Sequence, residues 1–456
     1  MLASNDNNQN QELAWVDSPL SSLLRLAWPI VVSMLSYSVM TLVDTLFVAR
    51  LGTAALSGVG LGGTFAFILI CFPIGVLGAV KILSSQAVGA GQRHSVQAFM
   101  GAGLVWALGL GAMAIAAGMG ISALLPHAAA SASAGAAAQD YLGIRVLGAM
   151  PVLIRIAIEQ GRMATGDSQS PMRVALLANV TNIALDYVFI VLLGFGVAGA
   201  AWATVSANVT GCLAMVLLQA REGFALRQTR RHHVGAIWRV GLPSGLQFVL
   251  EVGSFAAMVV MLTSLSDLDG AANQLGIQII HFGFLPCVAL GDAASILVGQ
   301  AVGAGRRDLV HVVARRALLP VVAYASLCTV AFAALGDQII VRMTPDPALV
   351  AVGAQLFLVA AGFQIADAIN IVARNVLRGT GDVRFCAWMG VAISWLLTPP
   401  LTWLFAYHLE LGVIGGWLAI LVDVYVGTAV FWLRLQLNHW HEASDASLRE
   451  LAAQPA

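Results

Sequence analysis

Long apolar segments recur along almost the whole chain and are separated by short polar ones. Windows of about 20 apolar residues, the length of helix that crosses a hydrocarbon core of about 30 Å, occur twelve times. The first six lie near residues 24–49, 55–83, 97–125, 136–162, 171–194 and 197–220, and the second six near 240–265, 271–299, 309–335, 348–377, 385–408 and 412–436. The pattern predicts an all-α integral membrane protein with twelve transmembrane helices.

The polar segments divide this pattern into two halves. The longest of them, residues 221–239, carries five arginines and is predicted to be a cytoplasmic linker between an N-lobe (21–220) and a C-lobe (240–437). Residues 1–20 are polar and lack the basic start and short apolar run of a signal peptide. We therefore expect 1–20 to be a disordered cytoplasmic N-terminus and 438–456 to be a cytoplasmic C-terminal tail.

Arginine is concentrated in alternate connections between the predicted spans. The connections after spans 2, 4, 6, 8 and 10 hold most of the arginines, whereas the opposite connections hold only Arg50 and Arg342. Because cytoplasmic loops carry an excess of positive charge, both termini are expected to face the cytoplasm. A bacterial-type inner membrane is the predicted location.

Composition excludes several classes of protein. Only 10% of the 456 residues are charged, against about 25% in an ordinary soluble domain, and the net charge is zero. The single lysine, Lys81, lies outside any phosphate-binding loop, and the chain has neither an HExxH zinc motif nor a Gly-x-Ser-x-Gly elbow. We expect no enzymatic activity, no cofactor and no nucleic-acid partner. The expected partners are the lipid bilayer and small molecules, and the expected working unit is a monomer.

The two halves share an internal repeat. Gln86-Ala-Val-Gly-Ala-Gly91 recurs 214 residues later as Gln300-Ala-Val-Gly-Ala-Gly305, and Thr165-Gly-Asp167 recurs 215 residues later as Thr380-Gly-Asp382. Since six spans separate equivalent positions, the repeats are parallel and related by an axis along the membrane normal. The sequence predicts two pseudo-symmetric six-helix lobes that face a central cleft.

Four acidic residues inside the predicted spans are the main functional candidates: Asp44, Asp186, Glu251 and Asp367. A charge at the centre of a transmembrane helix costs about 2.5–3.5 kcal/mol on insertion scales, and binding a proton or a cation relieves that cost. None of the four has an acidic counterpart at the repeat offset. We therefore predict that they carry proton or cation coupling, with H⁺ or Na⁺ as the coupling ion.

Polar residues at helical spacing surround each of these acids. They form a predicted supporting pocket made of Tyr37, Thr41, Asn179, Asn182, Gln247, Gln278, His281 and Gln364. His281 can also be read as a satisfied core histidine. Arg374 is expected to extend to the cytoplasmic interface rather than to take part in coupling. Asp292 and Asp423 are left without an assigned role.

In the order and spacing of its motifs, the chain resembles the multidrug and toxic compound extrusion (MATE) family. The matching pieces include Val43-Asp44-Thr45, the two Gln-Ala-Val-Gly-Ala-Gly segments, Asn182-Ile-Ala-Leu-Asp186 and Phe363-Gln364-Ile365-Ala366-Asp367. The resemblance implies a V-shaped pair of helical bundles. It also implies export of small amphiphilic, often cationic compounds by alternating access, driven by proton or sodium entry.

The resemblance extends to two branches of this family at once. A NorM-like branch relies on acids in spans 7 and 10, here Glu251 and Asp367, which would hold sodium. A DinF-like branch relies on acids in spans 1 and 5, here Asp44 and Asp186, and leans towards protons. Phe363 stands where the NorM-like branch often has a tyrosine. The alternative function is flipping of a lipid-linked saccharide, against which the scarcity of intramembrane arginines counts.

Overall fold

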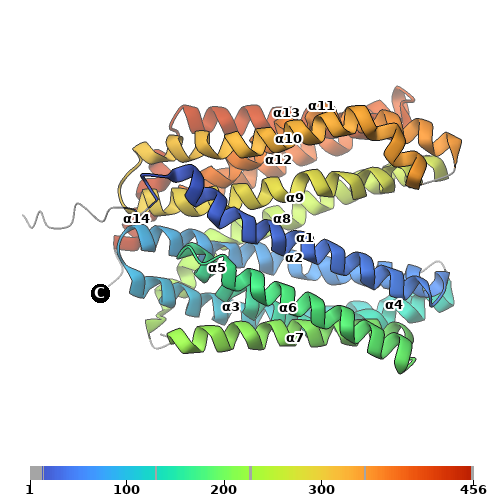
Figure 1. The fold of residues 1–456 in the computed structure, drawn as a ribbon, viewed down its shortest axis with the longest axis horizontal. Coiled ribbons are helices and arrows are strands. Elements are labelled where there is room, and N and C mark those ends of the chain that lie inside the picture. The colour runs from blue at the N-terminus through green and yellow to red at the C-terminus, as the bar shows by residue number, and fades with distance from the viewer. Residues whose placement is uncertain (1–12, 14, 129–130, 225–227, 344–345, 453–456) are drawn as a thin grey trace, which may run out of the picture. The chain divides into compact units, whose positions relative to one another are not determined.

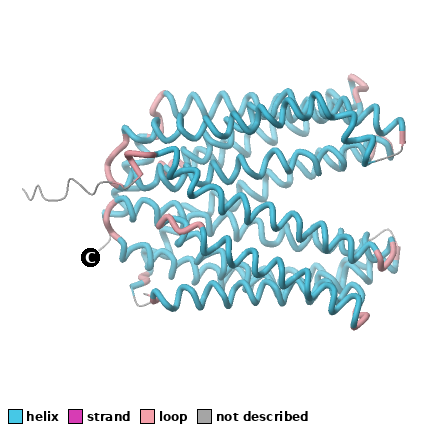
Figure 2. Tube along the Cα trace, in the orientation of Figure 1, coloured by secondary structure: helices cyan, strands magenta, loops and turns pink. Residues whose placement is uncertain are grey.

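The structure is a computed structural model in which residues 13, 15–128, 131–224, 228–343 and 346–452 are described. The described residues form helices joined by short connections and contain no strand (Figure 2). Twelve helical segments are long and apolar enough to cross a membrane. The predicted all-α membrane fold with twelve transmembrane helices is confirmed.

The first six spans are built from seven α-helices, which are labelled in Figure 1. They are α1 (Pro19–Ala49), α2 (Thr53–Gly89), α3 (Arg93–Ala128), α4 (Ala132–Arg145), α5 (Ala149–Ala164), α6 (Gln169–Asp186) and α7 (Gly196–Glu222). A short 3₁₀ turn, η1 (Val146–Gly148), joins α4 and α5 into one span, and a π-helical turn, η2 (Tyr187–Leu192), extends α6.

The second six spans are followed by one further helix. They are α8 (Arg231–Thr263), α9 (Asp267–Gly303), α10 (Asp308–Met343), α11 (Pro347–Gly379), α12 (Val383–Thr402) with its π-helical extension η4 (Trp403–His408), and α13 (Gly412–Gln436). The additional helix is α14 (His441–Ala452).

The chain forms two compact units that we call the N-unit and the C-unit. The N-unit comprises Trp28–Val88 and Gln92–Leu246, and the C-unit comprises Met1–Ala27, Gly89–Gly91 and Gln247–Ala456. Helix α7 continues to Glu222 and α8 begins at Arg231, so residues 221–222 and 231–239 of the predicted linker are helical. The boundary between the two units falls inside α8, between Leu246 and Gln247.

Both ends of the chain are more structured than predicted. The predicted disordered segment 1–20 includes Trp15, which is buried and donates a hydrogen bond from Nε1 to Oε1 of Gln300 at 2.9 Å. Residues 1–12 and 14 lie outside the described residues. In the predicted tail 438–456, Trp440 is fully buried and Asp445 of α14 pairs with Arg307. Burial of two indole rings explains this order, because each removes a large apolar area from water.

The internal repeat is visible in the backbone. Gly91 and Gly305 have φ values of 75° and 74°, and Gly166 and Gly381 both have φ of 95°. These left-handed conformations favour glycine and end the preceding helices. The π-helical turns η2 and η4 are also equivalent, and they are followed by Gly194 at φ 67° and Glu410 at φ 55°.

In the C-unit, α11 contacts α9, α10 and α13 (Figure 1). Glycines on the neighbouring helices make room for its polar side chains. A Cβ atom at Gly283 of α9 would lie 2.7 Å from Nε2 of Gln364, and one at Gly427 of α13 would lie 2.6 Å from Nδ2 of Asn370. These close approaches keep polar groups of α11 inside the unit, where the candidate site lies.

Candidate functional site

The N-unit brings together Asp44 of α1 and Asp186 of α6. The two side chains act on each other electrostatically. Asp186 is fully buried, and neither of its oxygens has a hydrogen-bond partner among the described residues. The same is true of Oδ1 of Asp44. Two predicted coupling residues from distant parts of the chain therefore form one pair.

This pair has a simple chemical requirement. An ionised carboxylate only accepts hydrogen bonds, so two carboxyl groups can bond to each other only when one of them carries a proton. Two adjacent ionised carboxylates in a buried place repel each other and lose their hydration. The arrangement therefore favours one shared proton over none.

Three further polar groups lie near the N-unit pair. Asn182, one turn before Asp186, is fully buried, and both polar atoms of its side chain lack a partner within the described residues. Arg145 at the end of α4 acts electrostatically on Asp44 and on Tyr141. Buried amides normally have partners, so Asn182 is a polar group beside Asp186 whose hydrogen-bonding capacity the described residues do not meet.

The other predicted N-lobe residues lie outside this pair. Nδ2 of Asn179 donates to Oγ of Ser36 at 2.7 Å and so joins α6 to α1. Tyr37 is 57% exposed. Thr41 is also exposed and donates to the carbonyl of Tyr37 in its own helix. Among the predicted supporting residues of the N-lobe, Asn182 is the one that lies next to an acid and has no hydrogen-bond partner among the described residues.

In the C-unit, Glu251 of α8 is already engaged by protein donors. Its Oε1 accepts from Nε2 of Gln247 at 2.8 Å and from Nη2 of Arg374 at 2.5 Å. Oε1 of Gln247 in turn accepts from Nη2 of Arg378 at 3.0 Å. The expectation that Arg374 extends to the interface is wrong. The Arg374 guanidinium instead forms a charge-assisted hydrogen bond with Glu251 between α11 and α8.

Asp367 of α11 lies in a different setting, on the wall of a cavity of about 290 Å³. His281 lies on the same wall, together with the aromatic side chains of Phe255, Phe284, Phe363 and Trp417. A cavity of this size, mostly apolar with a few polar groups, is typical of a small-molecule site. The core reading of His281 is not supported, since its side chain is exposed.

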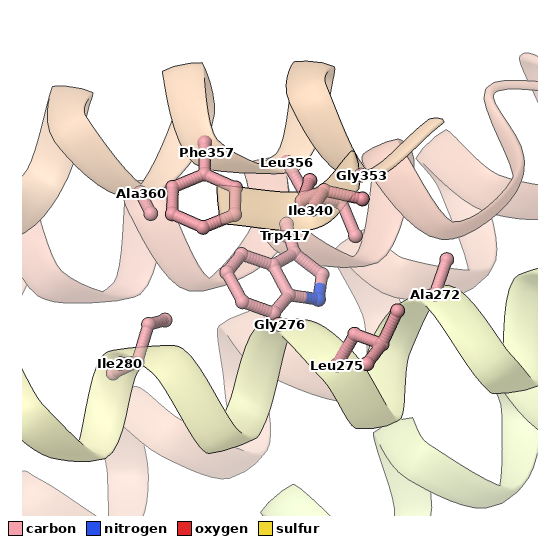
Figure 3. A pocket seen from close by; sticks show the side chains of 10 residues that line it. All are labelled: Ala272, Leu275, Gly276, Ile280, Ile340, Gly353, Leu356, Phe357, Ala360 and Trp417. Carbon is pink, nitrogen blue, oxygen red and sulfur yellow. The ribbon is translucent and has the colours of Figure 1, made fainter. Parts of the chain in front are cut away.

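Trp417 of α13 forms part of the cavity wall. Its indole lies against Gly276 of α9, with Phe357 and Ile340 beyond it (Figure 3). The hollow lined by Trp417, Phe357 and Ile340 has a volume of about 10 Å³, which is room for little more than one water molecule. Nε1 of Trp417 donates to Oδ1 of Asn273 at 3.0 Å and fixes the ring plane.

The two remaining predicted C-lobe residues, Gln364 and Gln278, differ in their exposure. Gln364 is buried, with Gly283 of α9 against its amide. Gln278 is exposed. Asp423 of α13, left unassigned by the sequence, acts electrostatically on Asp367 and has a buried oxygen without a partner among the described residues.

Outside the spans, the repeated Thr-Gly-Asp turns each hold an aspartate near an arginine. Burial would raise the pKa of Asp167, but hydrogen bonds from Ser170 and Arg162 outweigh it and lower that pKa. Burial raises the pKa of Asp382, although Nε of Arg434 donates to it at 2.9 Å. Both repeated aspartates therefore bond to an arginine near a helix end, but the pKa of Asp167 is lowered and the pKa of Asp382 is raised.

The family profile described as MatE matches the chain twice, over residues 29–188 and 243–404. The two matches begin 214 residues apart, which is the offset of the first repeated motif, and together they cover more than half of the chain. The chain belongs to the MATE family. The predicted resemblance is confirmed, and this MATE protein is a membrane transporter and not an enzyme.

Relatives with curated names point the same way. A probable multidrug resistance protein NorM of Pseudomonas putida is 31% identical over 87% of this MATE chain and 90% of its own length. A protein with the same name from Bradyrhizobium diazoefficiens is 29% identical over 91% and 92% of the two chains. These bacterial relatives and the twelve apolar helices support a multi-pass inner membrane protein.

Solved structures confirm the fold. A transporter of the MOP superfamily from Pyrococcus furiosus superposes with a TM-score of 0.87 at 20% identity, over 93% of this chain and 97% of its own. A eukaryotic MATE transporter, AtDTX14, gives a TM-score of 0.86 at 18% identity, over 94% and 98%. At these identities the likeness is one of fold.

Proposed function

We propose that this MATE transporter exports small amphiphilic, often cationic molecules by antiport against protons, with sodium acting as a modulator. Membership of the MATE family and the multidrug resistance names of its relatives support the export of drug-like compounds. The coupling mechanism is argued here from the two clusters of ionisable residues.

The observation that carries the proton assignment is the Asp44–Asp186 pair. Its two side chains act on each other electrostatically, and Asp186 is buried without a hydrogen-bond partner among the described residues. Two adjacent ionised carboxylates would repel each other, so we assign one proton to the pair in this state. When water reaches the pair, the charged form becomes less costly and the proton leaves. Loading on one side and release on the other would couple proton flow to a change of conformation, as alternating access requires.

The cavity beside Asp367 supports the choice of substrate. Aromatic rings attract cations through their faces, and a carboxylate supplies the opposite charge. The cavity of about 290 Å³ combines Asp367 with four aromatic side chains. A flat organic cation fits this chemistry better than a saccharide, whose hydroxyls need many hydrogen-bond partners. Export of organic cations is therefore favoured over the flipping of a lipid-linked saccharide.

Sodium at Glu251 and Asp367 is the second candidate for coupling. The sodium site expected from the NorM-like branch would need Glu251, whose Oε1 already accepts from Arg374 and Gln247. A sodium ion would have to displace a guanidinium to gain that oxygen. We therefore assign sodium a modulating role at Asp367 and the driving role to protons. The working unit is taken to be a monomer with both termini in the cytoplasm.

Transport by purified protein in sealed proteoliposomes tests the proposal. The probe is ethidium, a fluorescent aromatic cation, and the driving force is an imposed pH gradient or an imposed sodium gradient. We expect the pH gradient alone to drive ethidium transport and a protonophore to abolish it. Transport that follows the sodium gradient and ignores the protonophore would show that protons are not the driving ion.

A further inference from the structure

Glu251 has a cation of its own. Nη2 of Arg374 lies 2.5 Å from Oε1 of Glu251, and Nε2 of Gln247 donates to the same oxygen at 2.8 Å. Arg378 is bonded to the other end of the Gln247 amide, at 3.0 Å. Arg374 and Gln247 thus both donate to one carboxylate oxygen, and Arg378 holds the Gln247 amide from its other end. An ion-pair of this geometry leaves little negative charge to attract another cation.

The pair is also held by its surroundings. The guanidinium carbon of Arg374 lies 5.2 Å from the ring centre of Phe431, a cation–π arrangement. On α12, Gly390 leaves the space that the pair fills, since a Cβ atom there would lie 2.4 Å from Oε1 of Glu251 and 2.8 Å from Nη2 of Arg374. Three helices besides α8 therefore shape one position for the Arg374 head group.

Two carboxyl groups of the C-unit remain, Asp367 of α11 and Asp423 of α13. Hydrogen bonds next to each of them join the two helices: Thr428 donates to the carbonyl of Ala366 at 2.8 Å, and Asn370 donates to the carbonyl of Val424 at 3.4 Å. Oδ1 of Asp423 is buried without a partner among the described residues. The side chain of Asp423 also acts electrostatically on Asp367.

Other charged and ionisable groups lie near this network. His281 lines the same cavity as Asp367, and Cys287 acts electrostatically on Asp367. Arg378 acts on Glu251 and Asp292 as well as bonding to Gln247. The thiol of Cys386 on α12 lies 3.8 Å from the carbonyl oxygen of Arg374. Arg374 acts electrostatically on both Asp367 and Asp423, but its hydrogen bond goes to Glu251.

We propose that Arg374 is the fixed counter-ion of Glu251, so that this pair stays neutral and the exchangeable charge of the C-unit is carried by Asp367 together with Asp423. Arg374 is then a positioning residue. Its positive charge neutralises Glu251 and leaves Asp367 and Asp423 as the acids that exchange their charge. The inference rests on the proposed cation-coupled export. It differs from it by removing Glu251 from the ion-carrying set and adding Asp423.

A double-mutant comparison tests the pair. The variants are Glu251→Gln, Arg374→Gln, the double variant, Asp367→Asn and Asp423→Asn. Arg384→Gln, an exposed arginine at the start of α12, is the matched control for loss of a guanidinium. Ethidium transport in proteoliposomes is measured over a series of pH values, together with the unfolding temperature of each purified variant.

We expect each single variant of the pair to lose transport by about tenfold or more, because the partner is left as an uncompensated charge. The double variant should return to within about threefold of the parent with the same pH midpoint, since no charge is then left unpaired. Asp367→Asn and Asp423→Asn should both lose pH-driven transport, and the control should keep it.

A double variant that is as inactive as Glu251→Gln, yet unfolds at the parent's temperature, would overturn the proposal, because Glu251 would then be needed for its own ionisation. Parental transport by Asp423→Asn would overturn the role of Asp423. Should the parent itself fail to move ethidium under a pH gradient, the proposed function fails for this cation. In that case the unfolding temperatures test whether Glu251 and Arg374 form a pair. An unfolding temperature of the double variant close to that of the parent supports the pair, and a decrease equal to the sum of the two single decreases contradicts it.

Discussion

Replacement of Gly276 by alanine tests the packing that shapes the substrate cavity. A Cβ atom at this position of α9 would lie 2.3 Å from Cζ2 and 2.5 Å from Cη2 of the Trp417 indole. The hollow beyond the ring holds only about 10 Å³, so the ring cannot retreat in that direction (Figure 3). It must move towards the cavity of about 290 Å³ that contains Asp367.

The cost of Gly276→Ala follows from these contacts. Forcing an extra methyl group into a packed core costs about 1–3 kcal/mol. Moving the indole breaks its bond to Asn273, whose amide nitrogen already lacks a partner among the described residues, and this adds about 1–3 kcal/mol. The better helix propensity of alanine offsets about 1 kcal/mol. The net destabilisation should be about 1–5 kcal/mol, with weaker ethidium transport through the smaller cavity.

The assay uses the chain's own cysteines. Cys71, Cys212, Cys287 and Cys386 are buried, so a thiol-reactive dye reports their exposure as the purified protein is heated. Gly362→Ala on α11 is the matched control, since its nearest contact would be an ordinary 3.4 Å to a leucine methyl group. An unfolding temperature for Gly276→Ala that equals or exceeds that of the control would refute the close packing of α9 on α13.

Three further predictions concern the helix ends and the topology. Asp167→Asn should destabilise the protein at neutral pH, and because the native pKa of Asp167 is lowered, the deficit should shrink as the pH falls through that pKa; a pH-independent deficit in thermal unfolding would contradict this. Glu410→Gly should raise the unfolding free energy by up to about 1 kcal/mol, since φ is 55° there, and a lower unfolding temperature would argue against that strain. Leu268→Cys should react with an impermeant thiol reagent outside intact cells and Gln228→Cys should not; the reverse result would invert the orientation.

The sequence predicted the fold well because membrane insertion imposes a strong and regular pattern. Each span needs about 20 apolar residues, so hydropathy alone located all twelve. The repeated glycines were informative for the same kind of reason, since Gly166 and Gly381 take backbone conformations that other residues avoid. The ends of the chain were missed, because the contact between Trp15 and Gln300 joins positions 285 residues apart and leaves no local pattern.

The acidic residues of the candidate site were predicted from the sequence, but the side chains that contact them were not. The cost of a buried charge marks Asp44 and Asp186 wherever the helices go, whereas their contact depends on how α1 and α6 pack. Arg374 was misread because its spacing to Asp367 gave no hint of Glu251 on another helix. A count of charges inside the spans was the available signal, since an arginine within a predicted span needs an acidic partner.

Ethidium transport by Asp44→Asn under an imposed pH gradient tests the central claim most directly. Asparagine keeps the shape of the side chain and has an amide that can donate a hydrogen bond, but it cannot release a proton. We expect the variant to fold, to insert in the membrane and to unfold within a few degrees of the parent, while pH-driven transport falls to the level of empty liposomes. Transport equal to that of the parent would show that the carboxyl pair does not carry the coupling proton.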